Sequence, residues 1–244
     1  MSSFRITTYN IHKCQGLDRR VRPKRIADVL REIDADVVAL QEVVGMDEAA
    51  REHNQVHSIA EELGMDFRIG ENRRLRGGAY GNALLSRFEI VADRNHDLTW
   101  RRYEPRGCLE VTVTPPATER LPVQIFNVHL GTGFFERRYQ AHRLFEAIGG
   151  GNSDLSSPKI VLGDFNEWTR GVTTRLMCFH LNSAEPEQRL GRARTYPGVF
   201  PILHLDHVYY NSALKLQRVT VHRSRLALAA SDHLPIVAEF TVGE

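Results

Sequence analysis

The sequence lacks the features typical of secreted, membrane-spanning or zinc-thiolate proteins. Only three of its 244 residues are cysteines, and their odd number and scattered positions argue against a disulfide framework and favour a reducing compartment. No apolar run approaches the roughly 20 residues that cross a bilayer. The opening residues, MSSFRITTYN, have no basic region followed by an apolar one and so do not form a signal peptide. We therefore expect a soluble, cytoplasmic and monomeric protein.

Lysine is also scarce, with four lysines beside 28 arginines and a formal net charge of only +2. This net charge is too small to imply bulk attraction to nucleic acid. Arginine is the better bidentate phosphate ligand, but a biased genomic base composition gives the same skew and is the simpler explanation. The hydrophobic content of 42% and charged content of 25% are ordinary for a soluble globular chain, and the length fits one domain over residues 1–244.

The hydrophobic pattern predicts many strands and a few helices. Strands are expected at 4–9, 36–40, 66–70, 82–86, 108–113, 123–130, 159–163, 206–210, 216–221 and 234–240, and helices at 22–33, 47–63, 136–148 and 168–178. From residue 81 onward strands follow one another through short connections. This order favours an α/β sandwich of two packed, mostly antiparallel sheets flanked by helices over a doubly wound parallel sheet.

Polar side chains recur at the ends of these strands. In KIVLGDFNEW (159–168) an apolar strand ends at a glycine, and Asp164 and Asn166 then project to the same side. Five further motifs repeat the arrangement: TTYNIH with Asn10, VVALQEV with Glu42, FNVHLG with His129, LDHVYY with Asp206 and His207, and SDHLPIV with Asp232 and His233. Because strand ends of packed sheets converge on one edge, we expect these side chains to share a cleft.

Each of these residues has an ordinary explanation when it is taken alone. An Asp or Asn at a strand end usually caps a turn or helix, Glu42 could solvate a strand end, and His129 could be a satisfied core histidine. The conjunction of all the motifs favours a shared site instead. Two further candidates are Tyr80, in the glycine-rich stretch GGAYGNALLSR (77–87), and Arg106, in EPRGCLEV.

This set of residue types suits hydrolysis of a phosphate ester. Carboxylate and amide oxygens are hard ligands that suit Mg²⁺ or Mn²⁺, whereas the cysteines are too scattered for a zinc site. Such a cation neutralises phosphate charge and stabilises a leaving alkoxide. Histidine can donate a hydrogen bond or a proton, and an adjacent aspartate fixes the orientation of its ring. The composite predicts attack of water on phosphorus.

Seven motifs, in chain order, resemble the endonuclease/exonuclease/phosphatase superfamily: TYNIH, LQEV, GNALLSR, NVHLG, GDFN, LDHVYY and SDHLPIV. The superfamily includes pancreatic deoxyribonuclease, abasic-site endonucleases, neutral sphingomyelinases and inositol-polyphosphate phosphatases. The resemblance runs from residue 4 to about 240 and is greatest to short stand-alone bacterial members. It implies a four-layered α/β sandwich and a divalent-metal phosphoesterase.

The resemblance also implies roles for individual residues. By this resemblance, the metal ligands are Glu42, Asn10 and Asp232, and Asp164 activates the attacking water with Asn166 beside it. His233 contacts the phosphate and is oriented by Asp206. His129 provides a second phosphate contact or acts as a general acid. Arg106 and Tyr80 are expected phosphate contacts, and His207 is expected to be structural.

Two positions depart from the pattern of the family. Ala79 stands where many members have a glutamate that braces the second histidine, so that either Tyr80 substitutes or His129 is held less firmly. His12 weakens an assignment as a repair nuclease.

The substrate is less well determined by the sequence. A phosphodiester, either nucleic acid or a phospholipid headgroup, is favoured over an inositol phosphate because no lysine-rich pocket is evident. Phe134 and Phe135 follow His129 closely and could rest on a lipid surface, stack on a base or staple the following helix. WRRYEPR (100–106) would suit a phosphate-bearing polymer or a headgroup. The alternatives are a phosphomonoesterase for a small substrate and a catalytically silent binding module, which the completeness of the residue set opposes.

Overall fold

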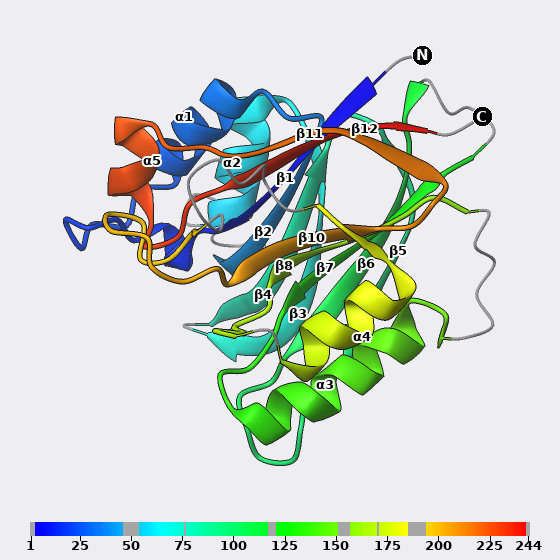
Figure 1. Ribbon diagram of the computed structural model, residues 1–244. Coiled ribbons are helices and arrows are strands. Elements are labelled where there is room, and N and C mark those ends of the chain that lie inside the picture. The colour runs from blue at the N-terminus through cyan, green and yellow to red at the C-terminus, as the bar shows by residue number, and fades with distance from the viewer. Residues whose placement is uncertain are drawn as a thin grey trace.

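The computed structural model describes residues 3–45, 54–75, 77–116, 121–150, 157–169, 171–184 and 194–242. Within these residues the chain forms two six-stranded β-sheets packed against each other, with helices on their outer faces (Figure 1). The predicted α/β sandwich is therefore confirmed. Each sheet is mixed, because one pair of neighbouring strands in each is parallel and the other pairs are antiparallel.

The first sheet has the strand order β11-β12-β1-β2-β4-β3, and β1 and β2 are its parallel pair. Its strands are β1 (Ser3–Asn10), β2 (Val37–Val44), β3 (Asp66–Leu75), β4 (Gly78–Ser86), β11 (Leu214–Val221) and β12 (Ile236–Val242). The last strand of the chain thus lies beside the first. This pairing brings the SDHLPIV motif next to the end of β1.

The second sheet has the order β5-β6-β7-β8-β10-β9, and β7 and β8 are its parallel pair. Its strands are β5 (Glu89–Asp97), β6 (Gly107–Thr114), β7 (Val123–His129), β8 (Lys159–Asp164), β9 (Asn182–Ser183) and β10 (Asp206–Tyr210). The strand that ends in the GDFN motif therefore lies between the strands that carry the NVHLG and LDHVYY motifs.

Helices cover the outer face of each sheet (Figure 1). They are α1 (Pro23–Ile33), α2 (Gln55–Leu63), α3 (Phe134–Ala147), α4 (Val172–His180) and α5 (Arg225–Ala230). The first, second and fifth pack on the first sheet through buried residues such as Ile26 and Ile59. The other two pack on the second sheet through Leu144 and Met177. A short 3₁₀ turn, η1 (His12–Cys14), follows β1 after one residue.

A hydrophobic core fills the space between the sheets. Ile6 and Val37 from the first sheet meet Leu109, Ile125 and Leu162 from the second, and all five are almost fully buried. Alternate side chains along each strand point into this layer, as expected for sheets that pack face to face. Burial of such side chains stabilises the fold by about 1.5–3 kcal/mol each, so the scaffold is rigid where it holds the strand ends.

Several predicted boundaries need correction. The helix expected at 47–63 begins at Gln55, because the Asn54 side chain accepts a hydrogen bond from His57 N at 3.1 Å and caps it; residues 46–53 lie outside the described part. The helix expected at 168–178 spans Val172–His180, and the one at 136–148 begins at Phe134. Sequence reasoning also missed β5, β9 and α5. The mostly exposed edge strand β5 has little of the apolar alternation on which strand prediction depends.

Candidate active site

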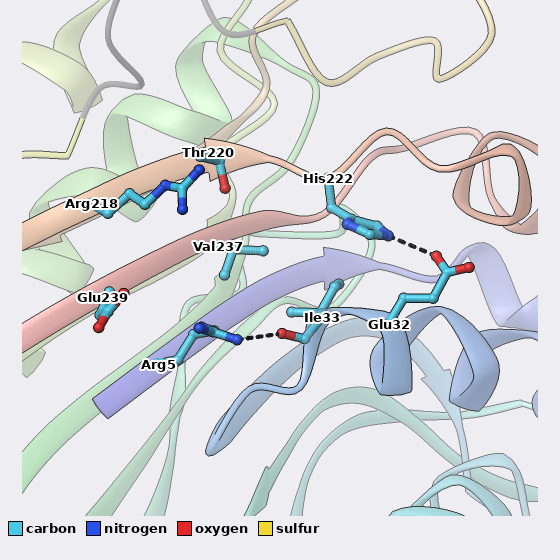
Figure 2. Close-up of a pocket in the computed structure, with 8 residues that line it drawn as sticks. All are labelled: Arg5, Glu32, Ile33, Arg218, Thr220, His222, Val237 and Glu239. Carbon is cyan, nitrogen blue, oxygen red and sulfur yellow. Dashed lines mark hydrogen bonds and ion pairs between the residues drawn. The ribbon is translucent and has the colours of Figure 1, made fainter. Parts of the chain in front are cut away.

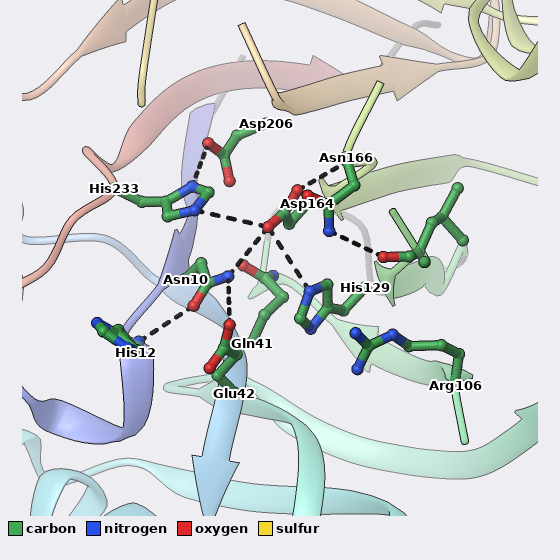
Figure 3. A network of polar contacts seen from close by, with 12 residues as sticks. Asn10, His12, Gln41, Glu42, Arg106, His129, Asp164, Asn166, Asp206 and His233 are labelled. Atoms are coloured by element: carbon green, nitrogen blue, oxygen red, sulfur yellow. Dashed lines mark hydrogen bonds and ion pairs between the residues drawn. The ribbon is translucent and has the colours of Figure 1, made fainter. Parts of the chain in front are cut away.

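The strand order places three predicted site residues side by side. His129 ends β7, Asp164 ends β8 and Asp206 begins β10. In the register of the sheet His129 is paired with Asp164, and Asp164 with Asp206. All three are buried. The second sheet thus presents a continuous row of two carboxylates and one imidazole at a single edge (Figure 3).

Asp164 is the centre of this site. Its Oδ2 accepts a hydrogen bond from Asn10 Nδ2 at 3.0 Å, which reaches across from the first sheet, and lies 3.7 Å from Nε2 of both His129 and His233. The two histidines therefore face one carboxylate oxygen (Figure 3). Burial raises the pKa of Asp164 to about 7, with the charge of His233 opposing the shift. A carboxylate with this pKa is suited to accept a proton at neutral pH.

His233 is held by Asp206 in a charged state. Its Nδ1 lies 2.9 Å from Asp206 Oδ2, and the ring of Tyr196 packs on it at 4.9 Å. Burial alone would lower the pKa of His233, but the carboxylates of Asp206 and Asp164 outweigh it and raise the pKa to about 10. The ring is therefore an imidazolium at neutral pH, with Nε2 directed to the centre of the site.

His129 is in the opposite state. Burial and the positive charge of Arg106 lower its pKa to about 3, although Glu42 acts in the other direction. His129 is therefore a neutral imidazole at the same distance from Asp164 as the charged His233. Two histidines whose surroundings drive their pKa values apart can take different roles in one reaction.

The GDFN turn owes its shape to two residues with unusual backbone angles. Gly163 has φ of 138°, and a Cβ there would lie 2.0 Å from Val128 O, so no other residue fits. Asn166 has φ of 49°, a conformation that asparagine tolerates better than most residues. Its backbone N–H donates to Asp164 Oδ1 at 2.9 Å and its side-chain amide donates to Leu130 O at 2.9 Å. The turn thus fixes both predicted polar residues relative to β7.

Glu42 lies on the other side of Asn10. The pairing of β2 with β4 shifts register between Leu40 and Val43, and Glu42 has φ of 57°, so a β-bulge turns its side chain toward the site. Asn10 Nδ2 is 3.4 Å from Glu42 Oε1, and Lys13 Nζ bonds the other carboxylate oxygen. Burial would raise the pKa of Glu42, but the hydrogen bond and positive charge of Lys13 are among the effects that lower it to about 2. Glu42 is therefore a carboxylate at any ordinary pH.

The turn η1 has left-handed backbone angles and contacts both Glu42 and Asp232. His12, Lys13 and Cys14 of η1 have φ of 44°, 57° and 58°, a run of three non-glycine residues in a conformation that is costly for each. The turn directs Lys13 to Glu42, and it places His12 Nδ1 at 3.5 Å from Asp232 Oδ1. Backbone strain of this kind concentrates at functional sites, and here it places the Lys13 ammonium on one predicted acidic ligand and the His12 ring beside the other.

The predicted ligands fit a hard divalent cation. Glu42 and Asp232 offer carboxylate oxygens, Glu42 is anionic, and the Lys13 ammonium already lies on its carboxylate as a cation. Asn10 offers Oδ1, which accepts from His12 N at 3.1 Å, while its Nδ2 faces Asp164 and Glu42. Asp164, Asp206 and His233 also bring three ligand atoms within 4.8 Å of one another. In that group, however, the ring nitrogen of His233 that faces Asp206 is already used in their ion pair. The Glu42 side is therefore the better candidate for the metal position.

Lys13 was missed by sequence reasoning, although its rarity and its place three residues after the strand-terminal Asn10 were visible signals. We expect Lys13→Met to bind Mn²⁺ about tenfold or more tightly, because two charges about 4 Å apart interact by about 4 kcal/mol at an effective dielectric constant of 20. Calorimetric titration with Mn²⁺ would measure this. Lys24→Met, on the exposed side of α1, is the matched control. Unchanged or weaker Mn²⁺ binding by Lys13→Met would contradict the expectation.

A buried amide network lies beneath the site and was also missed. Gln41 Nε2 donates to Asn127 Oδ1 at 2.7 Å, and Asn127 Nδ2 donates to the carbonyls of Leu40 and Ala83 at 3.0 and 2.9 Å. Asn82 Nδ2 donates to Asn127 O at 3.1 Å. These bonds connect β2 and β4 of the first sheet with β7 of the second. Such directional contacts in a buried layer fix the relative position of the two sheets.

The remaining sequence candidates lie around this centre. Tyr80 is buried, and in the described residues no hydrogen bond joins it to His129, so it does not replace the missing bracing glutamate. His207 is buried and stacks on Tyr209 at 5.7 Å, which agrees with a structural role. Phe134 and Phe135 are 56% and 69% exposed at the start of α3. This exposure leaves both rings accessible to a ligand.

A separate cavity of about 200 Å³ lies on the first sheet, between β1, β11, β12 and α1 (Figure 2). Several of its polar groups have partners nearby. Arg5 Nη1 donates to Ile33 O at 2.9 Å, and His222 Nε2 lies 2.9 Å from Glu32 Oε2. None of its lining residues belongs to the cluster around Asp164, so it is not part of the candidate active site. No helix in the described parts of the chain has the length and apolar character needed to cross a membrane.

Known proteins are similar to this chain in sequence and in fold. A model of the endonuclease/exonuclease/phosphatase family matches residues 7–233. The uncharacterized protein YbhP of Escherichia coli K12 is 32% identical over 246 residues, which cover 97% of this chain and 96% of YbhP. An endonuclease/exonuclease/phosphatase structure from Beutenbergia cavernae has a TM-score of 0.79 at 24% identity, covering 99% of this chain and 72% of that one. The mannosyl-6-phosphatase Bt3783 of Bacteroides thetaiotaomicron has a TM-score of 0.75 at 20% identity, covering 98% and 99%. These two structures support the shared fold alone.

Proposed function

The chain belongs to the endonuclease/exonuclease/phosphatase family, and from this premise we propose that it is a Mg²⁺- or Mn²⁺-dependent phosphodiesterase. The observation that carries the proposal is the geometry of two histidines whose Nε2 atoms both lie 3.7 Å from one oxygen of Asp164, one of them held by Asp206 at 2.9 Å. Their surroundings shift the two pKa values in opposite directions. Around this centre stand an anionic Glu42 and the amides of Asn10 and Asn166. A base, a cationic hydrogen-bond donor and oxygen ligands for a metal are therefore available within one buried site.

Asp164, His233 and Asp206 each have a definite part in the proposed reaction. Asp164 orients a water molecule and accepts its proton as the water oxygen forms a bond to phosphorus. The imidazolium of His233 donates a hydrogen bond to a non-bridging oxygen, and Asp206 holds its ring. The ester bond from phosphorus to the leaving oxygen breaks, and a proton from the solvent or a neighbouring group completes the alcohol. A divalent cation held by Glu42, Asn10 and Asp232 would neutralise phosphate charge and stabilise the leaving alkoxide.

The substrate classes that we consider are nucleic acid and phospholipid headgroups. The exposed rings of Phe134 and Phe135 would support either one, by stacking on a base or by resting at a lipid surface. Hydrolysis of a small phosphomonoester is the second candidate, since the similarly folded Bt3783 is named as a mannosyl-6-phosphatase. A silent binding module is disfavoured because Glu42, Asp164 and His233 are all in place.

A panel of substrates assayed with Mg²⁺ or Mn²⁺ tests the proposal. We expect hydrolysis of bis-p-nitrophenyl phosphate to exceed that of p-nitrophenyl phosphate, to stop in excess EDTA and to return when the metal is restored. Plasmid DNA, abasic duplex and sphingomyelin in the same panel separate the substrate classes. Robust hydrolysis in excess chelator would contradict the metal role, and a preference for the monoester would favour the second candidate.

A further inference from the structure

Two arginines near the candidate active site share a single carboxylate partner. Arg106 immediately precedes β6 and is only 8% exposed, and Arg73 lies on β3. Both guanidinium groups bind a single carboxylate, that of Glu104, with Arg73 Nη2 at 2.7 Å from one oxygen and Arg106 Nη2 at 2.9 Å from the other. The cluster therefore has two fixed cations for one anion.

The hydrogen-bonding capacity of these arginines is also incompletely used. Nε of Arg73 and Nε of Arg106 are buried, and neither has a hydrogen-bond partner among the residues that the structure describes. A guanidinium presents five N–H donors, and a buried donor without an acceptor is costly. Burial of the Arg106 charge adds to this cost, whereas the Arg73 side chain is 37% exposed. Both deficits would be removed by an anion with several acceptor oxygens.

The cluster is held in place before any ligand binds. Tyr80 lies opposite Arg73 in the β3–β4 register, and the Arg73 guanidinium lies 4.7 Å from the centre of its ring. A register shift between Glu71 and Arg73 marks a local bulge in β3. Burial raises the pKa of Tyr80, so that its hydroxyl stays protonated and able to donate. Two planar guanidinium groups and a phenol therefore form a preorganised set of donors.

The position of the cluster relates it to the candidate active site. Arg106 lies next to His129 and points toward the centre of the network (Figure 3). We propose that Arg73 and Arg106, with Tyr80 between Arg73 and the site, form a subsite for a second phosphate group of the substrate, next to the phosphate that is cleaved. This inference rests on the proposed function and narrows it: the preferred substrate is a phosphodiester that carries a further phosphate close to the scissile bond. Arginine suits that group because its fork matches the phosphate oxygens.

Direct binding tests the subsite without any turnover. Isothermal titration calorimetry with pyrophosphate, in buffer freed of divalent ions, should show binding that weakens about tenfold or more in Arg73→Met, because a charge-assisted bidentate contact is lost. Arg74→Met is the matched control, since Arg74 is the next residue on the same strand and lies opposite Ala79 instead of Tyr80. Thermal unfolding confirms that each variant is folded. Equal pyrophosphate affinity in Arg73→Met and the unmodified protein, or no binding by either, would overturn the proposal.

A pair of dinucleotides tests the same subsite during catalysis. The KM for 5′-phosphorylated pdTpdT should be about tenfold lower than that for dTpdT, and the ratio of the two should fall to about one in Arg73→Met. If dTpdT is hydrolysed but the unmodified protein shows no difference in KM, the subsite is wrong while the proposed function stands. If neither dinucleotide is hydrolysed although pyrophosphate binding depends on Arg73, the subsite stands and the proposed activity on phosphodiesters fails.

Discussion

Asp164→Asn should lower kcat for bis-p-nitrophenyl phosphate by about three to four orders of magnitude, because an amide cannot accept the proton of the attacking water. The substitution keeps the size of the side chain and one oxygen that can accept from Asn10 or from Asn166 N. The fold should therefore survive, with a melting temperature close to that of the unmodified protein. Steady-state kinetics at saturating Mn²⁺ measure the loss.

A second Asp→Asn substitution controls for the loss of one negative charge in Asp164→Asn. Asp93→Asn removes a carboxylate from the edge strand β5, where Asp93 pairs with Arg68 at 2.9 Å on the exposed surface. Surface ion pairs of this kind contribute little, so turnover in that variant should be unaltered. A kcat for Asp164→Asn within tenfold of the unmodified protein would remove Asp164 from the proposed role.

His233→Ala is expected to cost about three orders of magnitude in kcat, because it removes the cationic donor aimed at the phosphate. The pKa of about 10 has a further consequence: the imidazolium persists from pH 7 to pH 9, so activity that depends on it should not decline over that interval. The sign follows from the raised value, since deprotonation begins only as the pH approaches 10. Rates measured across this interval with the unmodified protein check the charge state.

The same substitution also affects stability, and the two effects must be separated. Asp206 is fully buried and would lose its partner at 2.9 Å, which costs about 3–5 kcal/mol for an uncompensated buried charge. Kinetics should therefore be measured well below the melting temperature of the variant. His222→Ala, which breaks the ion pair with Glu32 remote from the site, controls for loss of a histidine. Normal turnover in folded His233→Ala would exclude His233 as the phosphate contact.

The sequence was sufficient to predict the sandwich and most of its strands, because alternating and continuous apolar runs report burial directly. It also singled out His129, Asp164 and Asp206 as candidates that should lie together, since each interrupts such a pattern at a strand end, and the structure places them side by side. What it did not contain was the strand order. Only the placement of β8 between β7 and β10 makes these three side chains neighbours, and that order depends on pairings between segments far apart in the chain.

Other features depended on backbone geometry that no local pattern indicates. Lys13 reaches Glu42 because three successive residues adopt left-handed angles, and none of them is a glycine that would signal such a turn. Arg73 follows a register shift in β3, which sequence alternation alone does not locate. The opposite charge states of His129 and His233 likewise follow from which charged groups surround each ring, and this is a property of the assembled site.

The amide network around Asn127 has a mechanical consequence. An apolar interlayer resists separation of the two sheets but offers little resistance to a small lateral slip, since hydrophobic contacts have no preferred direction. The hydrogen bonds of Asn127 and Gln41 cross that layer and resist lateral movement, because any slip would stretch several short bonds at once. These bonds therefore also hold constant the distance between Asn10 on one sheet and Asp164 on the other. The alignment of the reacting groups is thus set by contacts in the interior of the protein.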